Sequence, residues 1–511
     1  MQKGLIYFIV DIDMCPDQKK LPGLFQNWLS VIGCILSVVS FSTILVLFIL
    51  DLKSQQVNPY LGIVTYMIAP TLFAVSLLLI PVGVLLERQR RRKGGHGAHF
   101  PVFDFNNPVH QRRAYIIIGL STVFLIFLMV VTYRAYEFTE SVTFCGQTCH
   151  QVMNPEYVAY QNSPHARVAC VDCHVGSGVG SYVRSKLAGT QMVYSVIFNK
   201  YHRPVETPIK NLRPAQETCE KCHWPRQFFG AVEKDKQYFL SDEKNTPWTN
   251  HMLMLVGGGV PPYGQRGGIH WHMNLSNKIY YITTDKKRQV IPWVKVVHAD
   301  GQEEIYVDKE SKFTADKPPK GEMRRMDCMD CHNRPSHGFK VPFVAVNEAM
   351  AFGAIDKDLP FIKREAVKAL EADYPSQGVA ASSIKKSLEE FYMKKYPEIW
   401  RQKKDFIVKT VQSVVEIYQQ NIFPDMKASW KEYPNNIGHM VFPGCFRCHD
   451  NKHQSAQGKV LSQNCTICHI IIKQGTPGAM EGSPDGVPFH HPDGDDDSWK
   501  QMNCVDCHSG S

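Results

Sequence analysis

Fourteen of the sixteen cysteines occur in seven clusters, and each cluster ends in Cys-His. Six clusters have two residues between the cysteines, and the first has three. With this composition, chance predicts about 0.02 copies of the two-residue-spacer cluster in the whole chain. The clusters are Cys145-Gly-Gln-Thr-Cys149-His150, Cys170-Val-Asp-Cys173-His174, Cys219-Glu-Lys-Cys222-His223, Cys328-Met-Asp-Cys331-His332, Cys445-Phe-Arg-Cys448-His449, Cys465-Thr-Ile-Cys468-His469 and Cys504-Val-Asp-Cys507-His508.

This spacing is typical of covalent haem attachment. The two thiols bond to the two vinyl groups of one haem, and the adjacent histidine ligates its iron. Disulfides would not need the following histidine, and zinc ribbons combine two Cys-x-x-Cys units in one site. The sequence therefore predicts seven covalently bound c-type haems, with the proximal iron ligands His150, His174, His223, His332, His449, His469 and His508.

Eleven further histidines compete for the second axial position of these irons, which low-spin c-type haems fill. They are His165, His202, His251, His270, His272, His298, His337, His439, His453, His490 and His491. His251 and His298 have no cluster nearby in sequence, and each could as easily be a surface histidine. The remaining three, His96, His99 and His110, lie in a segment expected to face the cytoplasm.

The formal charge of +9 does not produce a concentrated basic region in residues 134–511. Residues 1–133 hold 11 Lys/Arg against 6 Asp/Glu, which leaves 46 against 42 for residues 134–511. Because a nucleic-acid-binding protein needs a concentrated basic face, no nucleic-acid partner is expected. The composition also excludes a disordered chain and a small disulfide-stapled scaffold.

Three apolar stretches precede the first cluster, at residues 24–50, 61–86 and 114–132. Each reaches the roughly 20 residues that a helix needs to cross a bilayer. They contain no histidine for a b-type haem and no charged residue for a proton relay. Residues 1–133 are therefore predicted to be an anchor of three membrane spans. An alternative is that these spans also shape a lipid-side entrance for a quinone.

The charges of the loops predict the orientation of this multi-pass anchor. The segment between the second and third spans carries Arg88, Arg90, Arg91, Arg92, Lys93, Arg112 and Arg113. The positive-inside rule puts this segment and the N-terminus in the cytoplasm, so residues after the third span lie in the periplasm, outside the inner membrane. Haem attachment takes place outside the cytoplasm, which agrees with this orientation.

The exoplasmic residues are predicted to form three parts. Residues 134–337 hold four clusters and a β-rich insert (224–327), with strands expected at 278–284, 290–297 and 304–307. Residues 338–435 form a helical connector, with helical spacing at 348–354, 359–373, 380–395 and 406–421. Residues 436–511 form a loop-like module with three haems. The predicted fold class is a three-helix transmembrane anchor followed by a multihaem c-type cytochrome, mostly α and loop, with a haem-packed core.

Several segments resemble the NapC/NirT family of quinol dehydrogenases. They are Phe144-Cys-Gly-Gln-Thr-Cys-His-Gln-Val-Met153, His165, the second and third clusters, Tyr182-Val-Arg-Ser-Lys186-Leu and Cys328-Met-Asp-Cys-His-Asn-Arg-Pro-Ser-His337. The resemblance covers residues 115–223 and 328–337. It implies a four-haem module on a membrane helix that oxidises quinol and passes electrons to exoplasmic partners.

The resemblance also implies roles for single residues. The first haem would lie beside the quinol at the membrane surface. Met153 corresponds to a methionine that ligates this haem in one branch of the family, although it follows His150 by three residues here rather than two. His165 would ligate the fourth haem and His337 the third.

Lys186 matches a family lysine at the quinol site, while an alternative is that it binds a lipid phosphate. Residues 175–205 contain no Asp or Glu, so a carboxylate that accepts the quinol proton must come from elsewhere. Glu137, Glu140 and Glu156 are the candidates.

The C-terminal half departs from the four-haem pattern. Gly267-Gly-Ile-His270-Trp-His272 and the histidines around the fifth cluster resemble larger multihaem cytochromes with a quinol-oxidising head and a three-haem extension. By this analogy the distal ligands include one or both of His270 and His272, then His439, His453 and one of His490 and His491. His202 is a further candidate.

The favoured function is oxidation of membrane quinol, with menaquinol expected, in anaerobic or extracellular respiration. Seven haems would carry the electrons to periplasmic c-type cytochromes. One alternative is a passive conduit that accepts electrons from another membrane dehydrogenase. Another is a terminal reductase, which needs an open haem iron under a substrate pocket. The sequence is compatible with a homo-oligomer.

Overall fold

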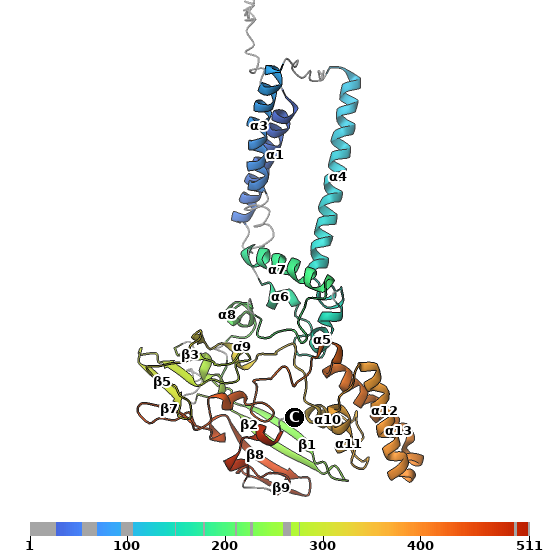
Figure 1. Cartoon of the computed structure of the whole chain (residues 1–511), viewed down its shortest axis with the longest axis vertical. Coiled ribbons are helices and arrows are strands. Elements are labelled where there is room, and N and C mark those ends of the chain that lie inside the picture. The colour runs from blue at the N-terminus through green and yellow to red at the C-terminus, as the bar shows by residue number, and fades with distance from the viewer. Residues whose placement is uncertain are drawn as a thin grey trace, which may run out of the picture. The chain divides into compact units, whose positions relative to one another are not determined.

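The computed structural model describes residues 27–53, 69–93, 106–148, 150–176, 179–209, 212–224, 228–258, 267–274, 276–494 and 498–508 (Figure 1). The chain divides into two compact units. The first comprises Met1–Arg134 and Ser177–Arg184, and the second comprises Ala135–Gly176 and Ser185–Ser511. The division at Arg134 coincides with the predicted end of the anchor.

Long apolar helices make up most of the described part of the first unit, which also includes the first residues of α7 (Val179–Ile197). They are α1 (Trp28–Lys53), α3 (Ala69–Arg92) and α4 (Pro108–Glu140), the last of which continues into the second unit. Within the described residues, α1 and α3 are long and apolar enough to cross a membrane. The third predicted span, residues 114–132, lies within α4, and its crossing of the membrane stays a prediction.

Small residues let α1 and α3 pack closely. A Cβ atom added to Gly33 would lie 2.9 Å from the carbonyl oxygen of Ser76. The Oγ atoms of Ser37 and Ser76 are hydrogen-bonded at 2.9 Å, and Ser30 Oγ donates to the Ile80 carbonyl oxygen at 2.9 Å. Small residues and hydroxyl hydrogen bonds at a helix contact are typical of packing in a bilayer.

Two antiparallel sheets form in the second unit (Figure 1). The order β1-β2-β8-β9 joins Val232–Phe239, Pro247–Met254, His469–Thr476 and Ala479–Gly482. The order β6-β3-β4-β5-β7 joins Arg324–Arg325, Lys278–Ile282, Trp293–Val297, Glu303–Asp308 and His453–Ser455.

The predicted strands at 278–284, 290–297 and 304–307 are confirmed as β3, β4 and β5. Strand β1 was not predicted because most of its residues are exposed and polar, so it lacks the alternation that marks a half-buried strand. The expectation of a loop-like C-terminal module is wrong for β7, β8 and β9. Strands β7 and β8 pair with β5 and β2 of the insert, and so distant a pairing leaves no local signal, while β9 forms a hairpin with β8.

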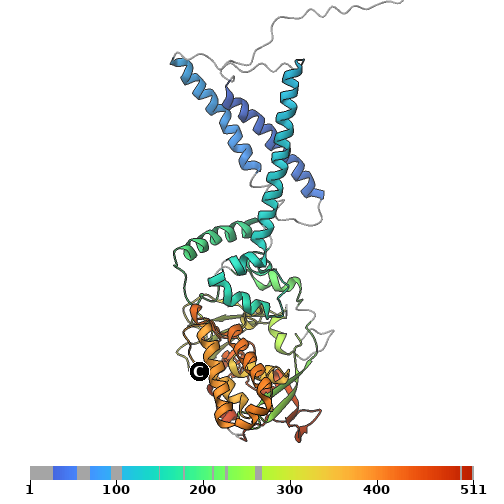
Figure 2. The same ribbon diagram turned by 90° about the vertical axis from the view of Figure 1, so that its right-hand side faces the viewer.

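The predicted helical segment forms α10 (Pro342–Ala351), α11 (Ile362–Glu371), α12 (Gln377–Lys395) and α13 (Pro397–Asn421). Figure 2 shows these helices, in orange, gathered together. They enclose an apolar core that includes the fully buried Ile384, Ile407 and Tyr392. Phe239 of β1 joins this core, and its backbone N–H donates to Asn347 Oδ1 at 3.1 Å. This part of the protein therefore has a side-chain core of its own.

Candidate haem centres

Six of the seven clusters lie on short helical turns. These are α6 (Cys170–His174), η3 (Cys219–Lys221), α9 (Cys328–Cys331), η8 (Gly444–Arg447), η9 (Cys465–Ile467) and α15 (Cys504–His508). A helical turn brings residues three apart to one face, so both thiols of a cluster can reach one macrocycle. None of the described cysteines forms a disulfide, and their thiols are therefore available for thioether bonds.

The first cluster has a different turn. Phe144–Thr148 forms a π-helical turn, which is wider than an α-helical one and accommodates the extra residue of this spacer. It is followed by α5 (His150–Gln161), on which Met153 is half-buried. Cys149 and the side chain of His150 lie outside the described residues.

Clusters that are consecutive in the chain are also neighbours in the structure. A hydrogen bond between thiols is the largest cause of the raised pKa of Cys145, whose partner is Cys170 in the second cluster. Burial raises the pKa of Cys173, and the neighbouring Cys219 of the third cluster adds to this effect. The third and fourth clusters meet in the same way, because the Cys219 thiol raises the pKa of Cys328.

The last three clusters continue this series. Burial raises the pKa of Cys331 to about 12, and the next contribution comes from Cys445 of the fifth cluster. Cys445 also adds to the burial that raises the pKa of Cys468 in the sixth cluster to about 11. Burial raises the pKa of Cys504 in the seventh cluster, and Cys465 of the sixth cluster contributes. Neighbouring clusters are thus close enough for their cysteines to interact.

A second histidine ring lies beside each of six cluster histidines. The pairs, with ring-centre distances, are His174–His337 (6.2 Å), His223–His165 (6.1 Å), His332–His270 (6.4 Å), His449–His272 (5.9 Å), His469–His439 (6.2 Å) and His508–His491 (5.9 Å). Two imidazole nitrogens that each bind one metal at about 2 Å, the length known for zinc, would place their ring centres about 6 Å apart. The histidine pairs therefore fit haem irons with two axial histidines.

Hydrogen bonds at Nδ1 orient several of these rings. The Nδ1 atom of His270 bonds to the Val256 carbonyl oxygen at 2.7 Å, and that of His272 to the Ile269 carbonyl oxygen at 2.8 Å. A partner at Nδ1 leaves Nε2 for the metal, as is usual for metal-ligating histidines. The same holds for Nδ1 of His165, His337 and His449, which bond to the carbonyl oxygens of Pro335, Glu156 and Ser462.

Burial favours the neutral, metal-binding form of most paired histidines. It is the first cause of a lowered pKa for His174, His272, His332, His337, His439, His449, His469 and His508. The pKa of His439 falls to about 4, and the neighbouring His469 contributes to this shift. A neutral imidazole offers the lone pair that iron requires.

The structure changes two expectations about the distal histidines. His165 lies beside His223 of the third cluster and His337 beside His174 of the second, so the pairing expected for these two residues is wrong. That pairing came from the resemblance, whereas the loop before the second cluster brings His165 to the third.

The structure also contradicts the expected role of His453 as a distal haem ligand. Its Nδ1 bonds to Asp450 Oδ1 at 2.9 Å and its Nε2 to the Ile291 carbonyl oxygen at 2.6 Å, inside the sheet. Burial opposes protonation of His453, but the bond and charge of Asp450 outweigh it and raise the pKa. With both nitrogens engaged in this way, His453 is not placed to ligate a haem.

The other candidate histidines have different surroundings. His202 is exposed, and among the described side chains no cluster histidine is paired with it. His251 contacts Asp235, His298 contacts Glu304, and His490 lies 3.5 Å from Glu481. Of these two adjacent histidines, His491 and not His490 lies beside His508 of the seventh cluster.

Lys186 forms an ion pair with Glu140, one of the three carboxylates among which the sequence did not decide. Its Nζ lies 2.5 Å from Glu140 Oε1, and the Glu140 side chain is 9% exposed. Among the three candidate carboxylates, Glu156 instead contacts Arg334 at 3.1 Å. Both members of the pair lie close to the first cluster, since Glu140 and Lys186 act in opposite directions on the pKa of Cys145, after the larger effects of Cys170 and burial.

The fold and these centres define a membrane-anchored multihaem cytochrome c that transfers electrons. Residues 108–216 match the model of the NapC/NirT cytochrome c family, N-terminal region. The chain is 41% identical over 496 residues to the cytochrome c-type protein ImcH of Geobacter sulfurreducens, which covers 96% of both chains. The chain belongs to the NapC/NirT cytochrome c family, and membership implies covalently bound haem.

A second relative is the cytochrome c-type protein NrfH of Wolinella succinogenes. It is 30% identical over 99 residues, which are 19% of this chain and 55% of NrfH. No solved structure matches the chain.

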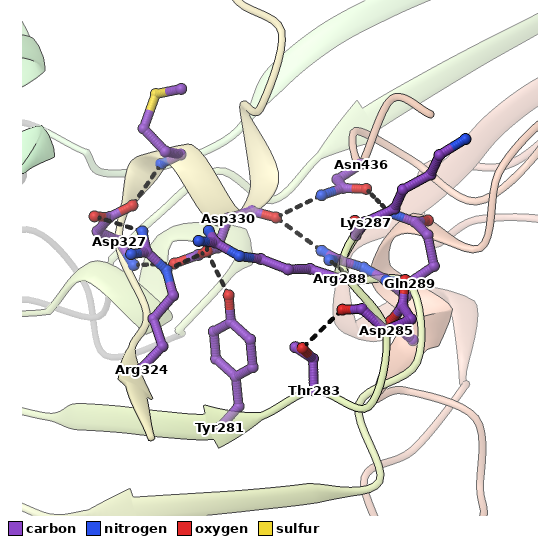
Figure 3. A network of polar contacts seen from close by, with 12 residues as sticks. Tyr281, Thr283, Asp285, Lys287, Arg288, Gln289, Arg324, Asp327, Asp330 and Asn436 are labelled. Carbon is purple, nitrogen blue, oxygen red and sulfur yellow. Dashed lines mark hydrogen bonds and ion pairs between the residues drawn. The ribbon is translucent and has the colours of Figure 1, made fainter. Parts of the chain in front are cut away.

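Sequence reasoning missed how the fourth and fifth clusters are joined. Asp330 and Arg447 each occupy the last spacer position of their cluster, and both are buried. A charged residue at a spacer position was the available signal, but its partners come from distant parts of the chain (Figure 3).

Proposed function

We propose that this protein is a quinol dehydrogenase that passes electrons from membrane quinol, expected to be menaquinol, through seven covalently bound haems to periplasmic c-type cytochromes. The observation that carries the proposal is the ion pair of Lys186 and Glu140 beside the first cluster. Glu140 ends α4, eight residues after the predicted third span, so this pair is expected near the membrane surface.

Lys186 and Glu140 carry out the proton transfer from the quinol. Oxidation of one quinol to a quinone releases two electrons and two protons. Lys186 donates a hydrogen bond to the quinol oxygen and stabilises the negative charge that develops as a proton leaves. Glu140 Oε2 is buried and has no hydrogen-bond partner among the described residues, so it can accept the first proton while Oε1 holds Lys186. The second proton passes to water.

The electron chemistry belongs to the cluster residues. When bound, each haem takes one electron at its iron, so one quinol reduces two of them. The cysteines would hold the seven haems in chain order, and the paired histidines would ligate the irons of six of them. This argues against a terminal reductase at those six centres, because two histidines on one iron leave no open position for a substrate. Met153 stays a candidate ligand of the first iron.

The test is anaerobic mixing of the purified holoprotein with a menaquinol analogue, followed by haem absorbance. Lys186→Met should slow quinol-driven haem reduction at least about tenfold, which corresponds to ~1.4 kcal/mol of transition-state stabilisation. Reduction by dithionite and the haem count should not change. Lys200→Met is the matched control, because Lys200 is exposed and contacts Tyr194 rather than a carboxylate. Equal quinol kinetics in both variants would support the passive conduit instead.

A further inference from the structure

Asp330 anchors the fourth cluster to the five-stranded sheet (Figure 3). Its side chain is 1% exposed. Its Oδ1 accepts hydrogen bonds from the Tyr281 hydroxyl at 2.5 Å and from Arg324 Nε at 2.8 Å. Its Oδ2 accepts from the backbone N–H of Asp327 at 2.8 Å, which closes the first turn of α9 as a capping box. Because a buried carboxylate needs this many partners, the fourth cluster has one defined position on the sheet.

The backbone of Asp330 is tied to the fifth cluster. Its carbonyl oxygen accepts from Arg447 Nη2 at 2.8 Å and from Asn436 Nδ2 at 3.0 Å. Arg447 lies inside the fifth cluster and is 9% exposed. It also donates to the carbonyl oxygens of Gly444 and Arg288, both at 2.8 Å. One guanidinium therefore joins the fifth cluster, the fourth cluster and the turn between β3 and β4.

A second element joins the distal histidines of the fourth and fifth centres. His270 and His272 lie on the same five-residue turn, η6 (Ile269–Met273). The first pairs with His332 of the fourth cluster and the second with His449 of the fifth. A turn of this length cannot move one histidine without moving the other. The fourth and fifth centres are thus held together on both their proximal and distal sides.

We propose that Arg447 and Asp330 are positioning residues that fix the separation of the fourth and fifth haems. This inference rests on the proposed function, because it takes electrons to enter at the first cluster. Arg447 holds the distance across which one electron passes from the fourth haem, which is oxidised, to the fifth, which is reduced. Electron transfer falls steeply with the distance between two haems, so a shift of one cluster away from the other slows this step. The contact therefore controls how fast electrons leave the four-haem module for the last three haems.

The first test is anaerobic mixing of the holoprotein with a menaquinol analogue. Arg447→Met keeps much of the side-chain volume but donates no hydrogen bond. In this variant about four sevenths of the absorbance change should keep its rate, and about three sevenths should slow at least tenfold. Arg401→Met is the matched control, because Arg401 is exposed on α13 and contacts Glu398 and the Pro397 carbonyl oxygen rather than either cluster. An unchanged rate for the last three sevenths, with seven haems present, overturns the proposal.

Arg447→Lys separates geometry from charge. Lysine keeps the positive charge, but a single ammonium cannot bridge three carbonyl oxygens as the planar guanidinium does. The slow phase should therefore remain in Arg447→Lys. Kinetics like those of the unaltered protein would mean that charge alone matters, and would overturn a positioning role.

A spectroscopic measurement tests the inference without quinol. The electron paramagnetic resonance spectrum of the oxidised holoprotein reports magnetic interactions between neighbouring ferric irons. Arg447→Met should change these interactions while pyridine haemochrome still counts seven haems. If the unaltered protein is not reduced by the quinol analogue, the proposed function fails, and this spectrum decides the inference by itself. If Arg447→Met loses haem, Arg447→Lys, which cannot bridge the three carbonyl oxygens, replaces it, and unchanged spectra in that variant overturn the proposal.

Discussion

Lys186 Nζ lies 2.5 Å from Glu140 Oε1, although 46 positions separate the two residues in the chain. The lysine comes from α7 (Val179–Ile197) and the carboxylate from the last residue of α4. The segment around Lys186 has no acidic residue of its own. A carboxylate from a neighbouring helix thus lies beside this lysine, and the proposed quinol chemistry uses it as the proton acceptor.

Glu140→Gln tests this carboxylate. An amide cannot accept the quinol proton, so quinol-driven haem reduction should slow at least about tenfold. Stopped-flow absorbance under anaerobic conditions measures the rate. Glu137→Gln, an exposed position one turn earlier on α4, should leave it unchanged. Equal rates in the two variants would remove Glu140 from the proposed site.

The haem count follows from the seven clusters. The intact holoprotein should exceed the 58.1 kDa of the polypeptide by seven haem masses, which is roughly 4.3 kDa. Mass spectrometry measures this excess, and pyridine haemochrome counts haem independently. A mass that corresponds to six haems would mean that the wider first cluster, at Cys145, is not used.

The histidine pairs make a spectroscopic prediction for the sixth centre. His439→Ala removes the ring beside His469, so one iron loses its second axial ligand. The reduced variant should bind carbon monoxide at about one seventh more of its haem than the unaltered protein does. His453→Gln is the matched control, because the bonds of His453 to Asp450 and Ile291 leave no nitrogen for iron. Added carbon monoxide binding in His453→Gln instead would show that the two assignments are reversed.

Lys363 makes the stability of the helical segment depend on pH. Burial lowers the pKa of Lys363 from 10.5 to about 7 in the folded protein, although Glu371 opposes the shift. Between these two values the unfolded chain binds more protons than the folded one, so the free energy of unfolding rises with pH across this window. The rise between pH 7 and pH 9 should be about 2 kcal/mol.

Denaturant unfolding followed by helical circular dichroism measures this dependence. Lys363→Met should remove the rise, even though it also loses the bonds to the Phe343 carbonyl oxygen and Asn347 Oδ1. Lys368→Met, at an exposed position of the same helix, should keep it. A rise that persists in Lys363→Met would contradict the assignment to this lysine.

The sequence alone determined the seven clusters, the apolar helices, the helical segment and three of the strands. These features depend on local spacing: a cluster needs two cysteines and a histidine within a few residues, and an amphipathic or apolar run is visible in one window. The resemblance to the NapC/NirT family rested on such segments and is confirmed.

Only the tertiary structure decided which distant residues meet. His165 and His337 lie beside clusters other than those expected, and His453 is hydrogen-bonded to Asp450 and to the Ile291 carbonyl oxygen. The partners of Lys186 and Asp330 likewise come from other elements of the chain. The physical reason is that a histidine or a carboxylate carries the same local signal whether it ligates a metal, accepts a proton or anchors a turn. Its surroundings, set by long-range packing, determine which of these it does.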